Sequence, residues 1–269
     1  MLRWNLKIFC LIIACLGAEL LSCASALGQS APRETLEKIP ASGACQAETV
    51  KLQLHKHALA VRQISGAILF NAGMLIDADG APNAYGPHDH GLDFTKNAKS
   101  GRAWAGVVTD VSGKPVVQRS GAYRGLYVSQ TTLHARGTRI ASSQTYVNAS
   151  KVPFIALPPE FTEQFGVEIG DLALVANTRN GKRAYAIFAD VGPSGKIGEG
   201  SIALAKALGI NANPRRGGVA SGISYLVFPE SGLGQGTLRT RGEINTSGAR
   251  FFRQWGGSRR LRACGSNSN

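Results

Sequence analysis

The clearest hydrophobic pattern in the chain lies in its second half, where two apolar runs flank a turn dipeptide. Residues 172–178 and 183–189 are both rich in apolar and β-favouring residues, and Asn180 and Gly181 stand between them. An Asn-Gly pair accepts the positive φ angles that a tight hairpin turn requires. The pattern therefore predicts a β-hairpin whose second strand ends at Asp190.

A short helix is predicted soon after this hairpin. Apolar residues recur at helical spacing between residues 202 and 208. Ser201 is a good N-cap because its hydroxyl can accept a free backbone N–H, and Gly209 can adopt the left-handed conformation that ends a helix. Glu199 stands just before this helix, near the positive end of its dipole.

The segment between the two acids, residues 191–198, is rich in glycine and contains a proline. Glycine lets the segment fold back, so Asp190 and Glu199 could come within roughly 6.5–9.5 Å, the separation at which an inverting glycosidase admits a water. One carboxyl then protonates the leaving oxygen while the other deprotonates the water. The alternative is an ordinary strand-loop-helix connection whose acids cap backbone N–H groups.

Many further short strands are predicted by apolar or alternating runs between glycine and proline turns. They lie at residues 67–70, 74–77, 104–110, 115–119, 125–133, 154–157 and 224–228, whereas 48–64 fits no single element type. Residues 158–165 and 246–255 read as short helical or turn segments. The whole pattern indicates a mainly β (α+β) fold with one clear short helix after the loop that joins the two acids.

The stretch around the two acids resembles the signature region of glycoside hydrolase family 75, the fungal-type chitosanases. The shared features are a strand ending in Ala189-Asp190, a Gly192-Pro193 turn, and the run Lys196-Ile-Gly-Glu-Gly-Ser201 that opens the helix. Residues 74–85, 127–132 and 146–158 also resemble the family, and the similarity covers roughly residues 64–230. The essential Asp and Glu of the family match Asp190 and Glu199.

This resemblance implies an endo-acting hydrolase that cleaves β-1,4 bonds of chitosan by inversion, with Asp190 and Glu199 as the catalytic pair. By analogy with other polysaccharide-active proteins, we expect a small closed barrel of the six-stranded double-psi type, with an open cleft. Asp77 and Asp79 are candidates for holding cationic sugars, and Tyr85 for stacking on a sugar ring. The alternative for these three residues is an ordinary turn with a core tyrosine.

Two further positions are candidates for substrate binding, namely Gln130 and Lys196. Gln130 lies in an alternating stretch that either lines a groove or covers a solvent face, and Lys196 belongs to the loop between the acids. Two other classes stay open beside a chitosanase. One is a double-psi-barrel enzyme that cleaves cell-wall peptidoglycan with Asp190 alone, and the other is a non-catalytic glycan-binding protein.

Three motifs could suggest a metal, and we expect none. The Asp77-Ala-Asp79-Gly80 pattern resembles the start of a calcium loop, but the later ligands and the distal Glu are missing. The run His88-Asp89-His90 reads as a solvated polar turn more readily than as a metal site or relay. No Cys/His cluster has zinc spacing. We therefore predict neither a metal nor a cofactor.

The N-terminal segment is typical of an exported protein. Residues 1–26 combine early basic residues, an apolar run and a small-residue cleavage site, and the run is too short and interrupted for an integral membrane span. Residues 27–46 read as a flexible lead-in. We expect a secreted or periplasmic protein, with an alternative in which Cys23 is the lipidated residue of a lipoprotein.

Cysteine usage agrees with export. Removal of residues 1–26 leaves Cys45 and Cys264, near the two ends of the mature chain. In an oxidising compartment this pair is expected to form a disulfide that ties down both termini. The alternative is two unpaired thiols.

The remaining division of the chain follows composition. We assign residues 47–231 to a chitosanase-like catalytic domain and the arginine-rich residues 232–269 to a basic extension packed on it. The formal net charge is +13, and chitosan is itself a polycation at mildly acidic pH, so long-range attraction to it is excluded. Local acids must therefore bind the substrate. Nucleic acid is a poor partner for an exported chain, and we expect a monomer.

Overall fold

The computed structural model describes residues 47–55, 57–137 and 141–265, and all of them belong to one compact unit. The predicted export segment 1–26, the lead-in 27–46 and the cysteines within them lie outside the described residues. Among the described residues, no helix has both the length and the apolar character that crossing a bilayer requires.

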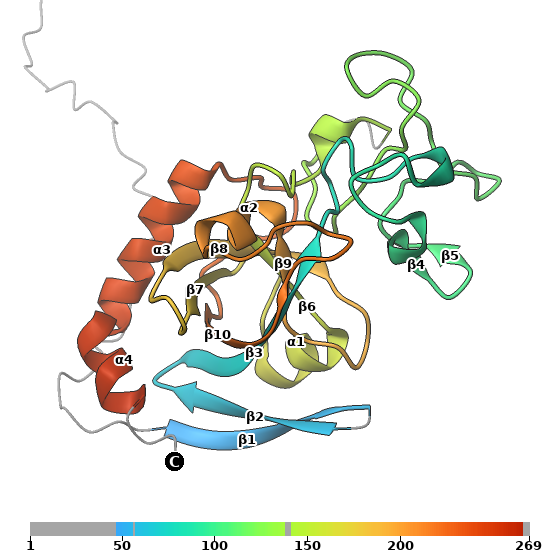
Figure 1. The fold of residues 1–269 in the computed structure, drawn as a ribbon. Coiled ribbons are helices and arrows are strands. Elements are labelled where there is room, and N and C mark those ends of the chain that lie inside the picture. The colour runs from blue at the N-terminus through green and yellow to red at the C-terminus, as the bar shows by residue number, and fades with distance from the viewer. Residues whose placement is uncertain (1–46, 56, 138–140, 266–269) are drawn as a thin grey trace, which may run out of the picture. The chain divides into compact units, whose positions relative to one another are not determined.

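Six strands of the described chain close into a barrel (Figure 1). Neighbouring strands follow the order β3-β10-β7-β8-β6-β9, and β9 closes the ring by pairing with β3. The β3–β9 and β6–β8 pairs are parallel, and the others are antiparallel. The strands are β3 (Ala67–Asp77), β6 (Phe154–Leu157), β7 (Leu172–Asn177), β8 (Arg183–Val191), β9 (Glu199–Ser201) and β10 (Val219–Phe228). The expected mainly β fold with a small closed barrel is confirmed.

An antiparallel hairpin extends the sheet beyond the barrel. Strands β1 (Ala47–Leu54) and β2 (His57–Ile64) pair along their whole length, and β2 then pairs with β3. This hairpin accounts for residues 48–64, whose pattern indicated no single type of element. Alternate residues of β1 such as Leu52 and Leu54 are buried, while the residues between them face solvent.

Helices cover parts of the barrel surface. The helix predicted after the two acids is present as α2 (Ile202–Ala207), and α1 (Pro159–Phe165) occupies the second predicted helical segment. The predicted C-terminal helix is longer than expected: α3 (Arg241–Trp255) begins five residues earlier because Thr240 and Glu243 form a capping box. It packs against β7 and β8. The helix α4 (Gly257–Gly265) was not predicted.

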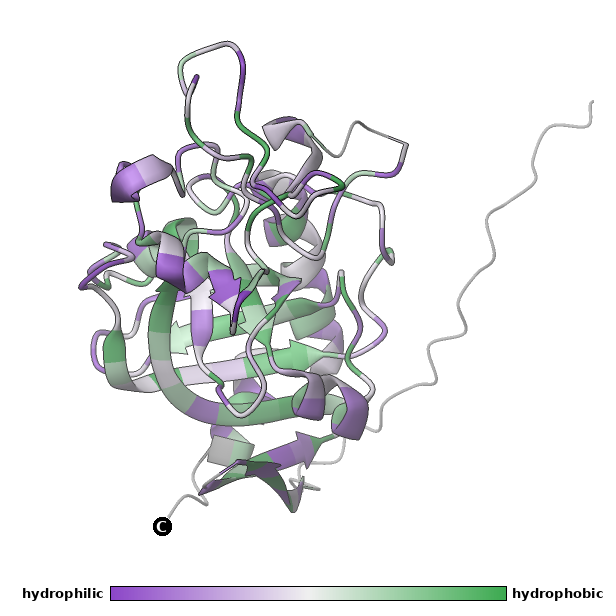
Figure 2. Ribbon diagram, turned by 90° about the vertical axis from the view of Figure 1, so that its right-hand side faces the viewer, coloured by the Kyte–Doolittle hydropathy of each residue, from purple (hydrophilic) through white to green (hydrophobic). Residues whose placement is uncertain are grey.

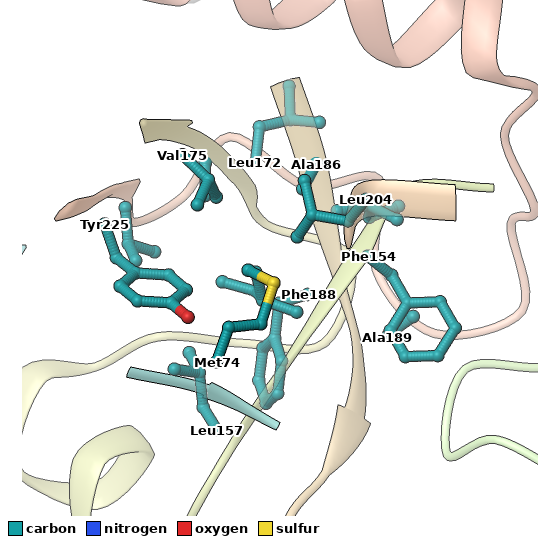
Figure 3. Packing of buried hydrophobic residues seen from close by; sticks show 14 of the residues in the cluster. Met74, Phe154, Leu157, Leu172, Val175, Ala186, Phe188, Ala189, Leu204 and Tyr225 are labelled. Carbon is teal, nitrogen blue, oxygen red and sulfur yellow. The ribbon is translucent and has the colours of Figure 1, made fainter. Parts of the chain in front are cut away.

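The barrel interior is filled by apolar side chains from every part of the ring. Figure 3 shows Met74 and Phe188 beside Leu157 and Tyr225, all of them buried. The Tyr225 ring stacks on Phe70 at a centroid distance of 4.7 Å, and its hydroxyl donates to the Gly73 carbonyl. Colouring by hydropathy shows the same distribution, with apolar strands at the centre and polar loops outside (Figure 2).

The prediction of two short strands at residues 67–70 and 74–77 is wrong, because both belong to the continuous strand β3. In the structure, a Cβ at Gly73 would lie 2.5 Å from the Val219 carbonyl oxygen, where the pairing of β10 with β3 is irregular. The glycine therefore permits a close backbone approach and does not end the strand.

The three strands predicted between residues 104 and 133 do not form as continuous strands, although residues 104–110 and 115–119 do pair antiparallel, as the hairpin expected there requires, through the bridge between Thr109 and Pro115. The two-residue strands β4 (Lys99–Ser100) and β5 (Ala103–Trp104) come at the start of this region or just before it, and the region pairs through isolated bridges, among them Val107 with Ser129 and Val117 with Tyr127. Each of these bridges pairs single residues, so the region consists of loops and not of continuous strands. Three short 3₁₀ segments complete the described elements: Pro87–Asp89, Thr95–Ala98 and Ser143–Thr145.

Candidate active site

A β-bulge positions Asp190 at the end of β8. Along the parallel β6–β8 pair, Ile155 lies opposite Phe188, but the next residue, Ala156, lies opposite Asp190. Ala189 is therefore the extra residue, and its carbonyl accepts a hydrogen bond from Leu133 N at 2.8 Å. A bulge shifts the alternation of a strand and turns the following side chain to the other face. Here it brings Asp190 level with Ala156.

Asp190 is held firmly through one carboxylate oxygen. The Thr132 hydroxyl donates to Oδ1 at 2.6 Å, and the backbone N–H groups of Thr132 and Val191 each donate to it at 2.9 Å. Burial raises the pKa of Asp190 to about 6, although the hydrogen bonds from Thr132, Val191 and Asp79 oppose that rise. Asp190 is thus oriented by fixed donors while it keeps an elevated pKa.

Glu199 pairs with the same residue of β6 as Asp190 does, namely Ala156, but from the neighbouring strand on the other side. In the antiparallel β6–β9 pair, Ala156 is opposite Glu199, and β9 also runs parallel to β3 with Leu75 beside Glu199. Residues directly opposite one another on adjacent strands point to the same face of a sheet. Two inter-strand steps separate the Cα atoms of Asp190 and Glu199, which is about 10 Å.

The pKa of Glu199 is raised to about 7, first by burial and then by the nearby Asp190 carboxylate. The positive charge of Lys196 opposes this rise. A helix N-terminus would also favour the charged form, but the free N–H of Leu204 is already bound by the Ser201 hydroxyl at 3.1 Å. Glu199 is therefore not used as a helix cap.

Two further acids from the end of β3 join Asp190. One carboxylate oxygen from each of Asp77, Asp79 and Asp190 lies within 4.8 Å of the others. Burial raises the pKa of both Asp77 and Asp79 well above its ordinary value, and the neighbouring acids raise it further. The Tyr85 hydroxyl donates to Asp79 Oδ1 at 2.6 Å. A cation placed among these carboxylates would relieve their mutual repulsion.

All four acids line one open cavity of about 760 Å³, which we call the acid trough. Its floor includes Ala156 and Gly106, and its walls come from the β3 end, the loop between Asp190 and Glu199, and the loops that carry Lys96 and Arg215. A residue with a side chain does not fit at position 106 in this packing, because its Cβ would overlap the Asp79 carboxylate. The trough is partly open to solvent, and its lining combines five acids with five basic residues, Lys96, Lys99, Lys196, Arg215 and Arg216.

Comparison with known protein families agrees with this geometry. Residues 74–252 match the model of the family described as fungal chitosanase of glycosyl hydrolase group 75, and the match covers more than half of the chain. The chain belongs to this family. It is therefore a chitosanase-type glycoside hydrolase, and the family suggests a polysaccharide substrate. No curated protein matched the chain in a search for relatives.

The structure of this family 75 glycosidase brings most of the predicted site residues together. Asp77, Asp79, Asp190, Glu199 and Lys196 all line the acid trough. The loop between Asp190 and Glu199 folds back as expected, with positive φ angles at two of its glycines. Asp190 is far in sequence from Asp77 and Asp79, yet the three carboxylates lie together in the structure.

Tyr85 and Gln130 serve the site differently from the predictions. Only 2% of Tyr85 is exposed, so the ring has no free face for a sugar and its hydroxyl orients Asp79. A ring this buried is unsuited to stacking, but Tyr85 does line the acid trough, so its assignment to the substrate site stays a prediction. Gln130 is outside the trough lining, and its side chain donates to the Ala105 carbonyl at 2.7 Å. Ala105 itself lines the trough, so Gln130 supports the wall.

The run His88-Asp89-His90 forms a polar turn. Asp89 Oδ1 accepts hydrogen bonds from the backbone and hydroxyl of Thr95, both at 2.7 Å, and these bonds lower the pKa of Asp89. The carboxylate therefore fixes the local turn.

Cys264 is buried at the end of α4. Its proposed partner Cys45 lies outside the described residues, so this disulfide remains a prediction.

Sequence reasoning missed three groups of residues at the site. Thr132, which binds Asp190, stands beside the candidate Gln130 in a segment already noted for its family resemblance. Asp93 is buried in the trough lining, and burial raises its pKa. The loop between the acids is tied down by Glu160, which accepts from Gly195 N at 3.0 Å. No local pattern could have identified these long-range contacts.

Proposed function

We propose that the protein is an endo-acting chitosanase that cleaves β-1,4 bonds with inversion, using Glu199 as the general acid and Asp190 as the general base. The observation that carries this proposal is the register of β8, β6 and β9, which sets both acids beside Ala156 on one face. Their Cα separation of about 10 Å suits the roughly 6.5–9.5 Å carboxyl spacing of inverting enzymes better than the shorter spacing of retaining enzymes.

The two pKa values support this division of roles. An acid catalyst must hold its proton near neutral pH, and a base must have lost its proton. Glu199, with a pKa of about 7, keeps a proton at a pH where Asp190, with a pKa of about 6, is ionised. The three hydrogen bonds to Asp190 Oδ1 are already among the causes that lower this pKa, and they orient the carboxylate to accept a proton from the water that attacks the sugar.

Substrate recognition follows from the charges of the trough. Chitosan carries ammonium groups, and the chain as a whole has a net charge of +13, so attraction must come from acids at short range. Asp77 and Asp79 are buried and crowded by like charges. An ammonium group would lower their pKa, displace protons and form charge-assisted hydrogen bonds. We propose that this cluster binds one glucosamine unit beside the cleavage point.

The open trough favours cleavage within a polymer over removal of terminal units. A chain can lie along a groove that is open to solvent, whereas an enclosed pocket accepts only an end. This is the basis for the endo-acting assignment, and the export signal predicted at residues 1–26 agrees with a substrate outside the cell.

The deciding experiment is digestion of chitosan by the purified mature chain, with the first-formed anomer detected by NMR. Inversion predicts that the α-anomer appears first from the β-linked polymer. Initial appearance of the β-anomer would overturn the two-carboxylate inverting mechanism, and no release of reducing ends would overturn chitosanase activity. Parallel assays on chitin and peptidoglycan separate this proposal from a cell-wall-cleaving enzyme and from a binding protein that releases no sugar.

A further inference from the structure

A cavity of about 530 Å³ lies between helix α3 and the barrel, and we call it the arginine pocket. Figure 1 shows α3 beside β7 and β8, the two strands that it contacts. The pocket is lined by Pro153, Leu174, Arg183, Ala184, Tyr185, Ala207, Arg241, Asn245, Ala249 and Phe252. None of the residues that line the acid trough is among them, so the two cavities are separate.

Helix and strand periodicity bring the polar residues of the pocket together. Arg241, Asn245 and Ala249 recur every four residues in α3, and such positions share one face of a helix. Arg183 and Tyr185 are two residues apart in β8, and such positions share one face of a strand. Two arginines therefore line the same cavity, one from the helix and one from the strand.

A glycine allows the helix to lie close to the strand. A Cβ at Gly248 would lie 2.6 Å from a ring carbon of Tyr185. The rings of Tyr185 and Phe252 have a centroid distance of 6.4 Å, and both residues line the pocket. Ligand sites commonly combine such aromatic surface with a few polar groups, in volumes of roughly 300–1,000 Å³. The arginine pocket has both properties.

The charge of the arginine pocket is positive and uncompensated. Among the described residues, its lining contains two arginines and no acid, whereas the acid trough balances five basic residues with five acids. Arg183 and Arg241 are exposed, and neither side chain has a hydrogen bond or ion pair within the described part of the chain. Glu243, the acid of α3, is bound by the backbone and hydroxyl of Thr240. An anion in the pocket would therefore meet two free guanidinium groups.

Further positive charge surrounds the pocket. Helix α3 carries Arg241, Arg250 and Arg253 against the single acid Glu243. Burial raises the pKa of Tyr185, and the charges of Arg253 and Arg183 oppose that rise, which is consistent with both arginines lying near its ring. The whole chain has a net charge of +13. A polyanion is therefore attracted over long range, whereas a polycation is not.

A carboxylate on a sugar matches this lining. A guanidinium group is planar and presents paired N–H donors, which fit the two oxygens of a carboxylate. The Asn245 amide adds a donor and an acceptor for sugar hydroxyls. The partly exposed Tyr185 offers an aromatic surface to the apolar face of a sugar ring. Together these groups suit a uronate, a sugar that carries a carboxylate.

We propose that the arginine pocket binds a uronate unit of an acidic polysaccharide and so attaches the enzyme to an anionic glycan. This binding function is additional to chitosan cleavage and does not depend on it. Arg183 is the first residue of β8, and Asp190 lies seven residues later in the same strand. This length of strand spans about 20 Å. The arginine pocket and the acid trough can therefore be occupied at the same time.

Binding of a defined acidic oligosaccharide tests the pocket. Trigalacturonic acid and its trimethyl ester are titrated by calorimetry into the mature chain at an ionic strength of about 0.15 M, which screens distant charges. We expect the acid to bind and the ester not to bind, because only the acid carries carboxylates. Arg183→Gln with Arg241→Gln should raise the Kd of the acid at least tenfold, because two charge-assisted pairs are lost.

The matched control is Arg119→Gln with Arg124→Gln, which removes the same charge from two exposed arginines outside both cavities. Its Kd for the acid should equal the wild-type value. An equal loss of affinity in the two double variants would show that net charge alone attracts the ligand, and would overturn the site. Equal binding of acid and ester by the wild type, or no binding of either, would also overturn it without relying on the folding of any variant.

Chitosan hydrolysis is measured on the same samples. It should be unchanged in both double variants, because none of the four arginines lines the acid trough. Loss of hydrolysis in the Arg183→Gln and Arg241→Gln variant alone would contradict the independence of the two cavities. A wild type that binds trigalacturonic acid but does not cleave chitosan would contradict the proposed function and leave the arginine pocket standing.

Discussion

Asp190 and Glu199 stand opposite the same residue, Ala156, on the two strands that flank β6. The first pairing is parallel and the second antiparallel, so the chain reaches the two positions from different directions. A bulge at Ala189 is required for this match, because regular pairing would have placed Ala189 opposite Ala156. The relative position of the two acids is therefore determined by backbone hydrogen bonds of the barrel.

The pH dependence of catalysis is the most direct consequence. In the proposed mechanism, activity requires ionised Asp190, with a pKa of about 6, and protonated Glu199, with a pKa of about 7. We expect a narrow bell-shaped profile of kcat/KM that rises near pH 6 and falls near pH 7, since this quantity reports the free enzyme. The two apparent pKa values of this profile describe the coupled pair of Asp190 and Glu199 and not either residue alone. Activity that still increases above pH 8 on a soluble glucosamine oligomer would contradict Glu199 as the acid.

Replacing Glu199 should separate catalysis from stability. The folded pKa of Glu199 is raised above its ordinary value of 4.5, so ionisation opposes folding as the pH rises through 4.5 to 7. Glu199→Gln should abolish most chitosan cleavage and stabilise the fold at pH 8 by up to about 3 kcal/mol, with no such gain at pH 4. Urea unfolding at both pH values measures this difference.

A matched control for this experiment is Glu163→Gln, which removes an exposed acid from α1. It should change neither activity nor the pH dependence of stability. If Glu199→Gln changes the stability equally at pH 4 and pH 8, the pKa of Glu199 is not raised in the folded state. If this variant cleaves chitosan almost as well as the wild type, Glu199 is not the general acid.

The hydroxyl of Thr132 should set part of the pKa of Asp190, the proposed general base. It donates to Asp190 Oδ1 at 2.6 Å, and this bond lowers the pKa of Asp190. Thr132→Val keeps the shape and the backbone donor but removes the hydroxyl, so the acidic limb of the profile should move to higher pH and kcat should fall about tenfold, the order expected when one charge-assisted bond is lost. Thr132→Ser, which restores the hydroxyl, should recover both. An unmoved acidic limb in Thr132→Val would limit Thr132 to a structural role.

The sequence predicts the elements that carry the acids better than it predicts the contacts between them. The β7–β8 hairpin and α2 follow from local signals, namely Asn180-Gly181 and Ser201, and both form as expected. Thr132 lies 58 residues from Asp190, and no local pattern encodes that bond.

Gly73, which lies between two segments that were predicted as separate strands, is a position whose role no local pattern reveals. Its role depends on the approach of β10, which pairs with β3 only in the folded barrel. Tyr85 likewise looked like a sugar-binding ring because its sequence does not reveal that the loop around it is buried. Family resemblance indicated the proposed catalytic pair, and tertiary packing supplies the environment that shifts the pKa values of both acids.

The loop between the acids should depend on the contacts that fix it outside the trough. Ser194 Oγ donates to Glu160 and lies 3.2 Å from His55 Nε2, while Gly195 N also donates to Glu160. Gly195 has a φ of +75°, and a Cβ there would overlap the His55 ring. Gly195→Ala should therefore displace the loop, lower kcat on chitosan at least tenfold and leave the folded core intact.

The control for this loop variant is Gly113→Ala. Gly113 has a nearly identical φ of +77°, but no atom lies within 4 Å of the added Cβ. Both variants place an L-residue in the left-handed region and should lose about 1 kcal/mol of stability for that reason alone. Only Gly195→Ala adds the collision with His55. If both variants lose activity equally, or neither does, the contact between the loop and His55 does not position Glu199, and the register of β9 alone must hold that acid in place.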